Sequence, residues 1–274
     1  MRGWIAVLGF CVWAFPSQAD ACSTCATGDP TLTTLGAGAP HAGRIRLGLE
    51  LQHRREEIHD VRLREERYAL GLAYSPLERL TLTATLPFAY QRLELTNLAE
   101  VRRWSLGDAS LRASVTLYQD RAFATRHLVA AIGGVELPTA TRPNDVPRDL
   151  QLGSRSWDAL LGLRYAWYAR PISIQLHALL GAPLDDSDRN ARTQLAGFAQ
   201  WQPLEPFGMR AGLRAEVEKR TSERGGWQLD GIAGLMSRVG DAVGWAQLVV
   251  PLGQSWRGGH QADWGVELGV SVDL

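Results

Sequence analysis

The chain has 274 residues, with 29 basic and 29 acidic side chains, 45% hydrophobic residues and a sequence pI near 7.0. A neutral chain lacks the excess of Lys and Arg that would neutralise nucleic-acid phosphates. After the apolar run in residues 3–15, no stretch reaches the length of about 20 apolar residues that a membrane-spanning helix needs. Composition therefore excludes a nucleic-acid-binding protein and a helical membrane protein.

Residues 1–21 carry the features of a secretory signal in their usual order. Arg2 supplies the positive start, residues 4–15 form the apolar core, and Ala19-Asp20-Ala21 provides the small-residue cleavage site. The sequence thus predicts export, with a mature chain that begins at Cys22. A lipid anchor on Cys22 is disfavoured, because Ala19 stands where lipoprotein signals carry an aliphatic residue.

Residues 22–42 have no strand periodicity and are rich in Gly, Ala and Thr. Export from a bacterium would place Cys22 and Cys25 in an oxidising compartment, so a local disulfide is the leading prediction. A metal or redox role, or no role, stays open, whereas Ala26 in place of histidine excludes haem attachment. The segment is expected either to hang in the periplasm or to fold into the lumen of the domain that follows.

From residue 43 onward, apolar and polar residues alternate in segment after segment, as in a β-strand with two unlike faces. In the last segment, Trp264, Val266 and Leu268 share one face, and Gly265 and Glu267 share the other. The pattern predicts twelve strands, at residues 43–56, 62–75, 79–93, 104–118, 125–138, 154–168, 171–181, 192–202, 206–218, 227–237, 242–252 and 263–274. Many exceed the ~5 or 6 residues of ordinary strands and match the ~9 to 11 that cross a bilayer at a tilt.

The links between these segments alternate in length. Those after even-numbered segments are short, whereas those after odd-numbered segments are mostly longer and more polar, the longest being residues 139–153. Aromatic residues gather near both ends of the segments, as at a membrane boundary. The sequence therefore predicts, for residues 43–274, an all-β transmembrane antiparallel up-and-down barrel in the bacterial outer membrane with both termini periplasmic. A soluble β-sandwich fits less well, because its strands would be shorter.

The polar face of each segment would line the barrel interior. The candidate pore-lining residues are Arg44, Arg46, Glu50, Arg67, Asp108, Arg112, Asp158, Arg164, His177, Arg210, Arg214 and Asp230. Charges of mixed sign suit a conduit whose selectivity comes from charged side chains, and they suit equally a barrel filled by paired charges. Both interpretations stay open.

The sequence predicts no catalysis. No Gly-x-Ser-x-Gly or His-Glu-x-x-His motif occurs, and His177 is expected to line the lumen rather than act as a base. We therefore expect no enzyme activity, no cofactor and no metal site.

Three short motifs carry a family resemblance: LGDASL at 106–111, GVELPT at 134–139 and LGSRSWD at 152–158. In this order they resemble a family of bacterial outer-membrane barrels described as transporters, or as proteins of the meta-pathway of phenol degradation. The resemblance implies passive passage of small, aromatic or hydrophobic compounds. The chain departs from the family pattern at Ala140 and Arg155, where glycine is usual, and at Leu274, where the terminal strand usually ends in an aromatic residue.

The expected function is therefore an outer-membrane channel for small solutes. Its expected partners are outer-membrane lipid, the solute itself and the barrel-assembly machinery, with the oligomeric state open. The alternative is a closed structural or docking barrel whose segment 22–42 contacts a redox or metal-handling protein.

Overall fold

The computed structural model describes residues 43–58, 61–95, 100–120, 127–141, 153, 155–169, 171–184, 191–204, 206–218, 226–256 and 260–274. These residues form thirteen β-strands. The strands are β1 Ile45–Ile58, β2 Val61–Leu77, β3 Leu80–Leu95, β4 Val101–Leu106, β5 Ser110–Gln119, β6 His127–Glu136, β7 Asp158–Ala169, β8 Ile172–Pro183, β9 Arg192–Leu204, β10 Phe207–Glu218, β11 Gly226–Val239, β12 Ala242–Trp256 and β13 His260–Asp273. In this part of the chain, no helix has the length and hydropathy to cross a membrane.

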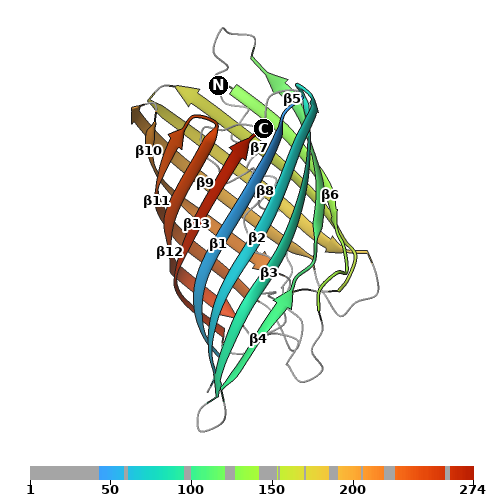
Figure 1. The fold of residues 1–274 in the computed structure, drawn as a ribbon, viewed down its shortest axis with the longest axis vertical. Helices are drawn as coiled ribbons and strands as arrows, with labels where there is room; N and C mark the ends of the chain where they lie inside the picture. Colours follow the sequence, from blue (N-terminus) through green and yellow to red (C-terminus); the bar gives the residue numbers. More distant parts are fainter. Residues whose placement is uncertain are drawn as a thin grey trace, which may run out of the picture.

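All the strands belong to one antiparallel sheet that closes on itself (Figure 1). Apart from β4 and β5, strands that follow one another in the chain pair side by side, and the pairing of β1 with β13 closes the circle. Because β4 and β5 both pair with β3, one near each end of it, they are two halves of a single barrel strand. The barrel is thus twelve-stranded, which confirms the predicted fold.

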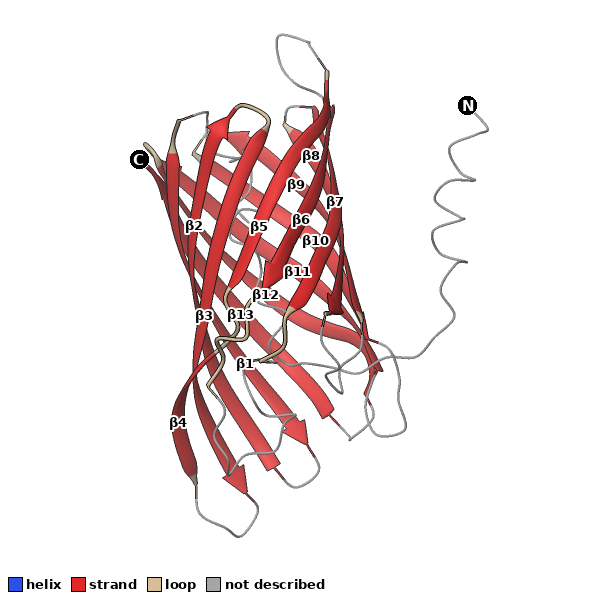
Figure 2. Cartoon of the chain, turned by 90° about the vertical axis from the view of Figure 1, so that its right-hand side faces the viewer, coloured by secondary structure: helices blue, strands red, loops and turns tan. Residues whose placement is uncertain are grey.

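The sequence prediction is wrong at one strand. Residues 104–118 were expected to form one continuous strand, but the chain leaves strand geometry at residues 107–109. The alternation changes phase here, because Trp104 and Leu106 take outer-face positions before the break and Leu111 takes one after it, an odd-numbered position instead of an even one. This shift by one residue was the sign of the break in the sequence. Figure 2 shows β3 and β4 continuing beyond the ends of β6 and β7.

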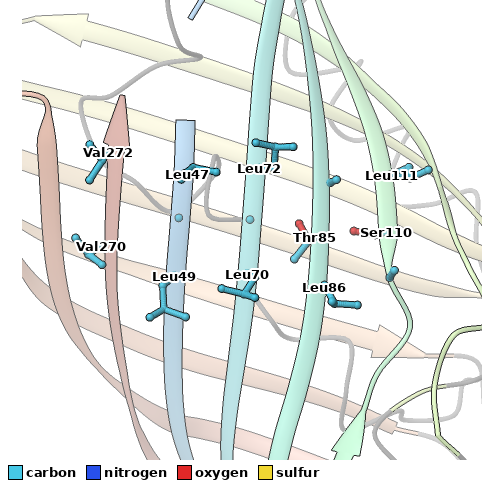
Figure 3. Close-up of a pocket in the computed structure, with 14 residues that line it drawn as sticks. Leu47, Leu49, Leu70, Leu72, Thr85, Leu86, Ser110, Leu111, Val270 and Val272 are labelled. Carbon is cyan, nitrogen blue, oxygen red and sulfur yellow. The ribbon is translucent and has the colours of Figure 1, made fainter. Parts of the chain in front are cut away.

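The two faces of the sheet differ as expected for a barrel in lipid. Leu47 and Leu49 on β1 point outward and are 48% and 42% exposed, whereas the next residue, Glu50, points inward and is 1% exposed. A soluble protein would show the reverse. On the outer face a groove of about 700 Å³ crosses β13, β1, β2, β3 and the start of β5 (Figure 3). Its walls are aliphatic side chains, including Leu70, Leu72 and Val270.

The two ends of the barrel can be told apart. At the terminal end, where the chain termini of the barrel meet, the Ile45 amide donates to the Leu274 carbonyl at 3.3 Å. The tight turn between β11 and β12 lies at this end and contains Gly240, whose φ of 60° suits glycine. Toward the opposite, far end, Trp104 is 63% exposed on the outer face and contacts the Tyr90 ring, with 5.2 Å between ring centroids.

Candidate functional site

The inner wall of the barrel is the candidate site, and one line of register neighbours across it is strongly polar. Arg210, Gln247, Glu267, Gln52 and Arg67 lie on β10, β12, β13, β1 and β2 as consecutive Cα partners, with Gly234 of β11 filling the one position between Arg210 and Gln247. We call these five residues the polar row. None of the five is more than 4% exposed.

Side chains of the polar row bind one another along the wall. Arg210 donates to Gln247, and Gln247 donates to Glu267. Gln52 donates to the other oxygen of Glu267 at 2.8 Å. Because Gly234 has no side chain, Arg210 can reach across β11; a Cβ at Gly234 would lie 2.7 Å from the Gln247 Cβ. Glu267 is therefore the central acceptor of the row.

Two further groups extend this network. On one side, Arg214 donates to Glu267 and also pairs with Asp230, each at 3.2 Å. On the other side, Glu65 accepts hydrogen bonds from Arg67 and Gln91. Buried charges in low dielectric need such partners, since an unpaired one carries a large desolvation cost.

The inner wall also carries apolar side chains, which we call the apolar strip. Its members, all 4–7% exposed, are Phe198 on β9, Ile232 and Met236 on β11, and Val243, Trp245 and Val249 on β12. Two rings occupy the space beside glycines of neighbouring strands: a Cβ at Gly212 would collide with Phe198, and a Cβ at Gly269 would collide with Trp245.

Arg210 joins the polar row to the apolar strip. Its guanidinium carbon lies 4.9 Å from the centroid of the Phe198 ring and 5.6 Å from that of Trp245. A guanidinium near an aromatic face is attracted by the ring quadrupole, more so where water is excluded. The arrangement sets one buried guanidinium between two buried aromatic rings on the inner wall.

The structure places most of the predicted pore-lining residues in the barrel wall. Arg46 is buried near the terminal end and donates to Asp273 at 2.9 Å, whereas Arg44 lies exposed on the rim and contacts Asp241 at 3.4 Å. Arg164 and His177 are half-buried partners across β7 and β8, and Arg112 is half-buried on β5. The remaining residues on the list are Glu50, Arg67, Asp158, Arg210 and Asp230, each 5% exposed or less, and the half-buried Arg214.

Asp108 has a different position from the rest. It lies in the break between β4 and β5, and its carboxylate accepts the backbone amides of Ala140 and Arg155, each at 3.0 Å. Asp158, which closes the third motif, accepts a hydrogen bond from Ser156 at 2.7 Å.

Charged side chains also gather at the far end, outside the strands' inner wall. Glu100 accepts hydrogen bonds from Arg102 and from Arg92, the latter at 3.0 Å. The hydrogen bond from Arg102 lowers the pKa of Glu100 below its ordinary value, and the nearby positive charges act in the same direction. This carboxylate is therefore ionised at neutral pH.

Sequence reasoning missed the apolar strip. The segments that became β11 and β12 carry apolar residues on both faces, so alternation alone did not reveal an inward Trp245 or Met236. The inward Gly212 and Gly269 were the available signal, because a position without a side chain makes room for a ring on the next strand. The predicted disulfide of Cys22 and Cys25 and the segment 22–42 lie outside the described residues. Within the described ranges, no three His, Cys, Asp or Glu side chains gather as metal ligands.

Among solved structures, an outer-membrane channel from Pseudomonas putida F1 is similar over 86% of this chain and 97% of its own, with a TM-score of 0.70 and 14% identity. The NanC porin is similar over 82% of this chain and its full length, with a TM-score of 0.53 and 8% identity. The β domain of the Bordetella autotransporter BrkA gives a TM-score of 0.52 at 12% identity, covering 85% of this chain and all of its own. No family model and no curated protein matches the sequence. At these identities the likeness establishes a fold that outer-membrane barrels share.

Proposed function

We propose that this chain is an outer-membrane channel through which small solutes diffuse passively. A closed barrel of twelve strands with leucines on its outer face and charges on its inner face is suited to lipid outside and water inside. The hydrogen bonds of the polar row join β10 to β12, β12 to β13 and β1 to β13, so they hold these side chains along the wall.

The proposed solutes are small aromatic or hydrophobic compounds. The observation that carries this choice is the apolar strip, in which Phe198 and Trp245 face inward beside Arg210. Porin interiors are typically polar, so an inward aromatic wall indicates contact with apolar parts of a solute. The family resemblance of the three sequence motifs points to the same class of compound.

The proposal includes a route to the membrane. Residues 1–21 would direct export, the barrel-assembly machinery would insert the chain, and the terminal end, where Ile45 meets Leu274, would face the periplasm. The short turns at this end, such as residues 240–241, agree with the periplasmic side of known barrels.

The experiment is a conductance measurement in planar lipid bilayers. The purified, folded mature chain should produce stepwise ion currents. A folded barrel, judged by its heat-modifiable migration on gels, that stays silent at every voltage would contradict the channel function.

A further inference from the structure

The three motifs that carry the family resemblance meet at one place in the barrel wall. The first spans the break between β4 and β5, the second leads from β6 into the link between β6 and β7, and the third leads from that link into β7. Strand pairing joins their ends, since Ser110 is the partner of Glu136 and Glu136 is the partner of Asp158, and further hydrogen bonds join the residues outside the strands. Within the described residues, β4 pairs with β3 alone, whereas β5 pairs with both β3 and β6.

Two threonine side chains take the place of the missing strand partner at the break. Thr139 accepts the Ala109 amide at 2.8 Å and donates its hydroxyl to the Gly107 carbonyl at 3.0 Å. The Thr141 amide donates to the Leu106 carbonyl at 2.9 Å, and the Thr141 hydroxyl accepts the Leu106 amide at 2.9 Å. Backbone groups in a membrane-spanning wall must be satisfied within the protein, so these contacts make the break tolerable.

The Asp108 carboxylate binds backbone amides on both sides of the β6–β7 link. One carboxylate oxygen accepts the amide of Ala140, which leads out of β6, and the other accepts the amide of Arg155, which leads into β7. Hydrogen bonds to an ionised acceptor are stronger than those between neutral groups. The two sides also touch, because Ala140 is 3% exposed and a Cβ at Gly153 would collide with its side chain.

The backbone at Arg155 has a left-handed conformation, with φ of 52°. This conformation costs little for glycine and more for any residue with a Cβ, which explains why the family pattern favours glycine here. The conformation aims the Arg155 amide at Asp108, so the strained residue is also one of the two that the carboxylate holds.

We infer that Asp108 is a positioning residue for the far-end mouth of the channel. By holding Ala140 and Arg155 together, its carboxylate sets where the longest link of the chain leaves and rejoins the barrel wall. This inference rests on the proposed function for its effect on current, but the hydrogen bonds that it invokes can be tested without any current.

The first measurement is amide hydrogen exchange at residues 140 and 155 in the full mature chain, reconstituted in lipid. Asp108→Ala removes both acceptors and should raise exchange at both amides by about tenfold or more, because each loses a protecting hydrogen bond. Asp108→Asn keeps one side-chain oxygen as an acceptor, so it should raise hydrogen exchange at one of the two amides more than at the other. Unchanged exchange in Asp108→Ala would overturn the inference.

Two control variants test whether the change in exchange comes from the loss of the Asp108 carboxylate. Asp241→Asn makes the same chemical change on the terminal-end rim and should leave both amides protected. Arg155→Gly keeps the backbone amide but removes the side chain and its strain, so it should keep the Asp108 contact. Faster exchange at residue 140 in Arg155→Gly would contradict the role given to the carboxylate.

The second measurement is the single-channel current. Asp108→Ala should show larger fluctuations of the open-channel current than wild type, while its heat-modifiable migration stays that of a folded barrel. A conducting wild type and an Asp108→Ala variant with the same current trace would overturn the positioning role. A silent wild type would instead overturn the proposed function and leave the exchange result to decide on the hydrogen bonds.

Discussion

The polar row and the apolar strip occupy the same inner wall, yet they are held in different ways. Members of the row depend on each other, since Glu267 accepts hydrogen bonds from both Gln52 and Gln247. Aromatic members of the strip instead need a glycine on the neighbouring strand, as Phe198 occupies the space that a side chain at residue 212 would fill. We therefore expect the loss of a polar side chain of the row to lower mainly the stability of the barrel. We expect added volume beside the strip to change mainly the passage of ions and solutes through the lumen.

The largest expected effect comes from removing the central acceptor of the row. Glu267→Ala leaves the half-buried Arg214 and the buried Gln52 and Gln247 without one of their partners. Breaking a buried charge network in this way costs about 3–5 kcal/mol of unfolding free energy. Urea unfolding, followed by heat-modifiable migration, should show the loss, with a smaller one for Glu267→Gln; a loss within experimental error for Glu267→Ala would mean that the row does not stabilise the barrel.

An intermediate effect is expected from filling the space beside the strip. In Gly212→Ala the new methyl group would meet the Phe198 ring and the Gly197 carbonyl oxygen. Overpacking of this kind costs about 1–3 kcal/mol, and displacement of the ring into the lumen should lower the single-channel conductance.

Gly133→Ala is the matched control, because a Cβ at Gly133 meets no atom within 4 Å. This variant should unfold and conduct as wild type does. Equal effects of Gly212→Ala and Gly133→Ala would show that the close approach of Phe198 to Gly212 has no consequence.

The smallest effect is expected from an ion pair outside both groups. Arg44 and Asp241 pair on the rim at 3.4 Å, with side chains that are 47% and 62% exposed. Exposed pairs contribute about 0–1 kcal/mol, so Asp241→Asn should change the urea midpoint little, and less still at high salt. A loss comparable to that of Glu267→Ala would remove the distinction between buried and exposed pairs.

Much of the fold could be predicted from alternation alone. A strand in a barrel shows lipid at every second residue, so Trp264, Val266 and Leu268 indicate both the strand and its outer face. The same rule placed Arg67, Arg210 and Glu50 on the inner face, where the structure has them buried. It could not say which side chains pair, because Arg210 and Gln247 are partners only once Gly234 of the strand between them is in register.

Periodicity marks the break between β4 and β5 only by a shift of the apolar positions between Leu106 and Leu111, and it does not show what stabilises the break. What stabilises it is a set of contacts from residues far along the chain, such as Thr139 and Arg155, and sequence spacing does not report these contacts. The three motifs were visible in the sequence, but only the fold brings Asp108 to the two sides of the link.

The most direct test of the central claim is whether an aromatic solute enters the lumen and contacts the strip. Benzamide and propanamide share a polar group and differ in the ring, so their effects on single-channel current can be compared at equal concentration. We expect benzamide to interrupt the current more often than propanamide, and Phe198→Ala to weaken that interruption by up to about tenfold, as the loss of one aromatic contact would. Equal interruption by both solutes in wild type, or an unchanged benzamide effect in Phe198→Ala, would contradict the account.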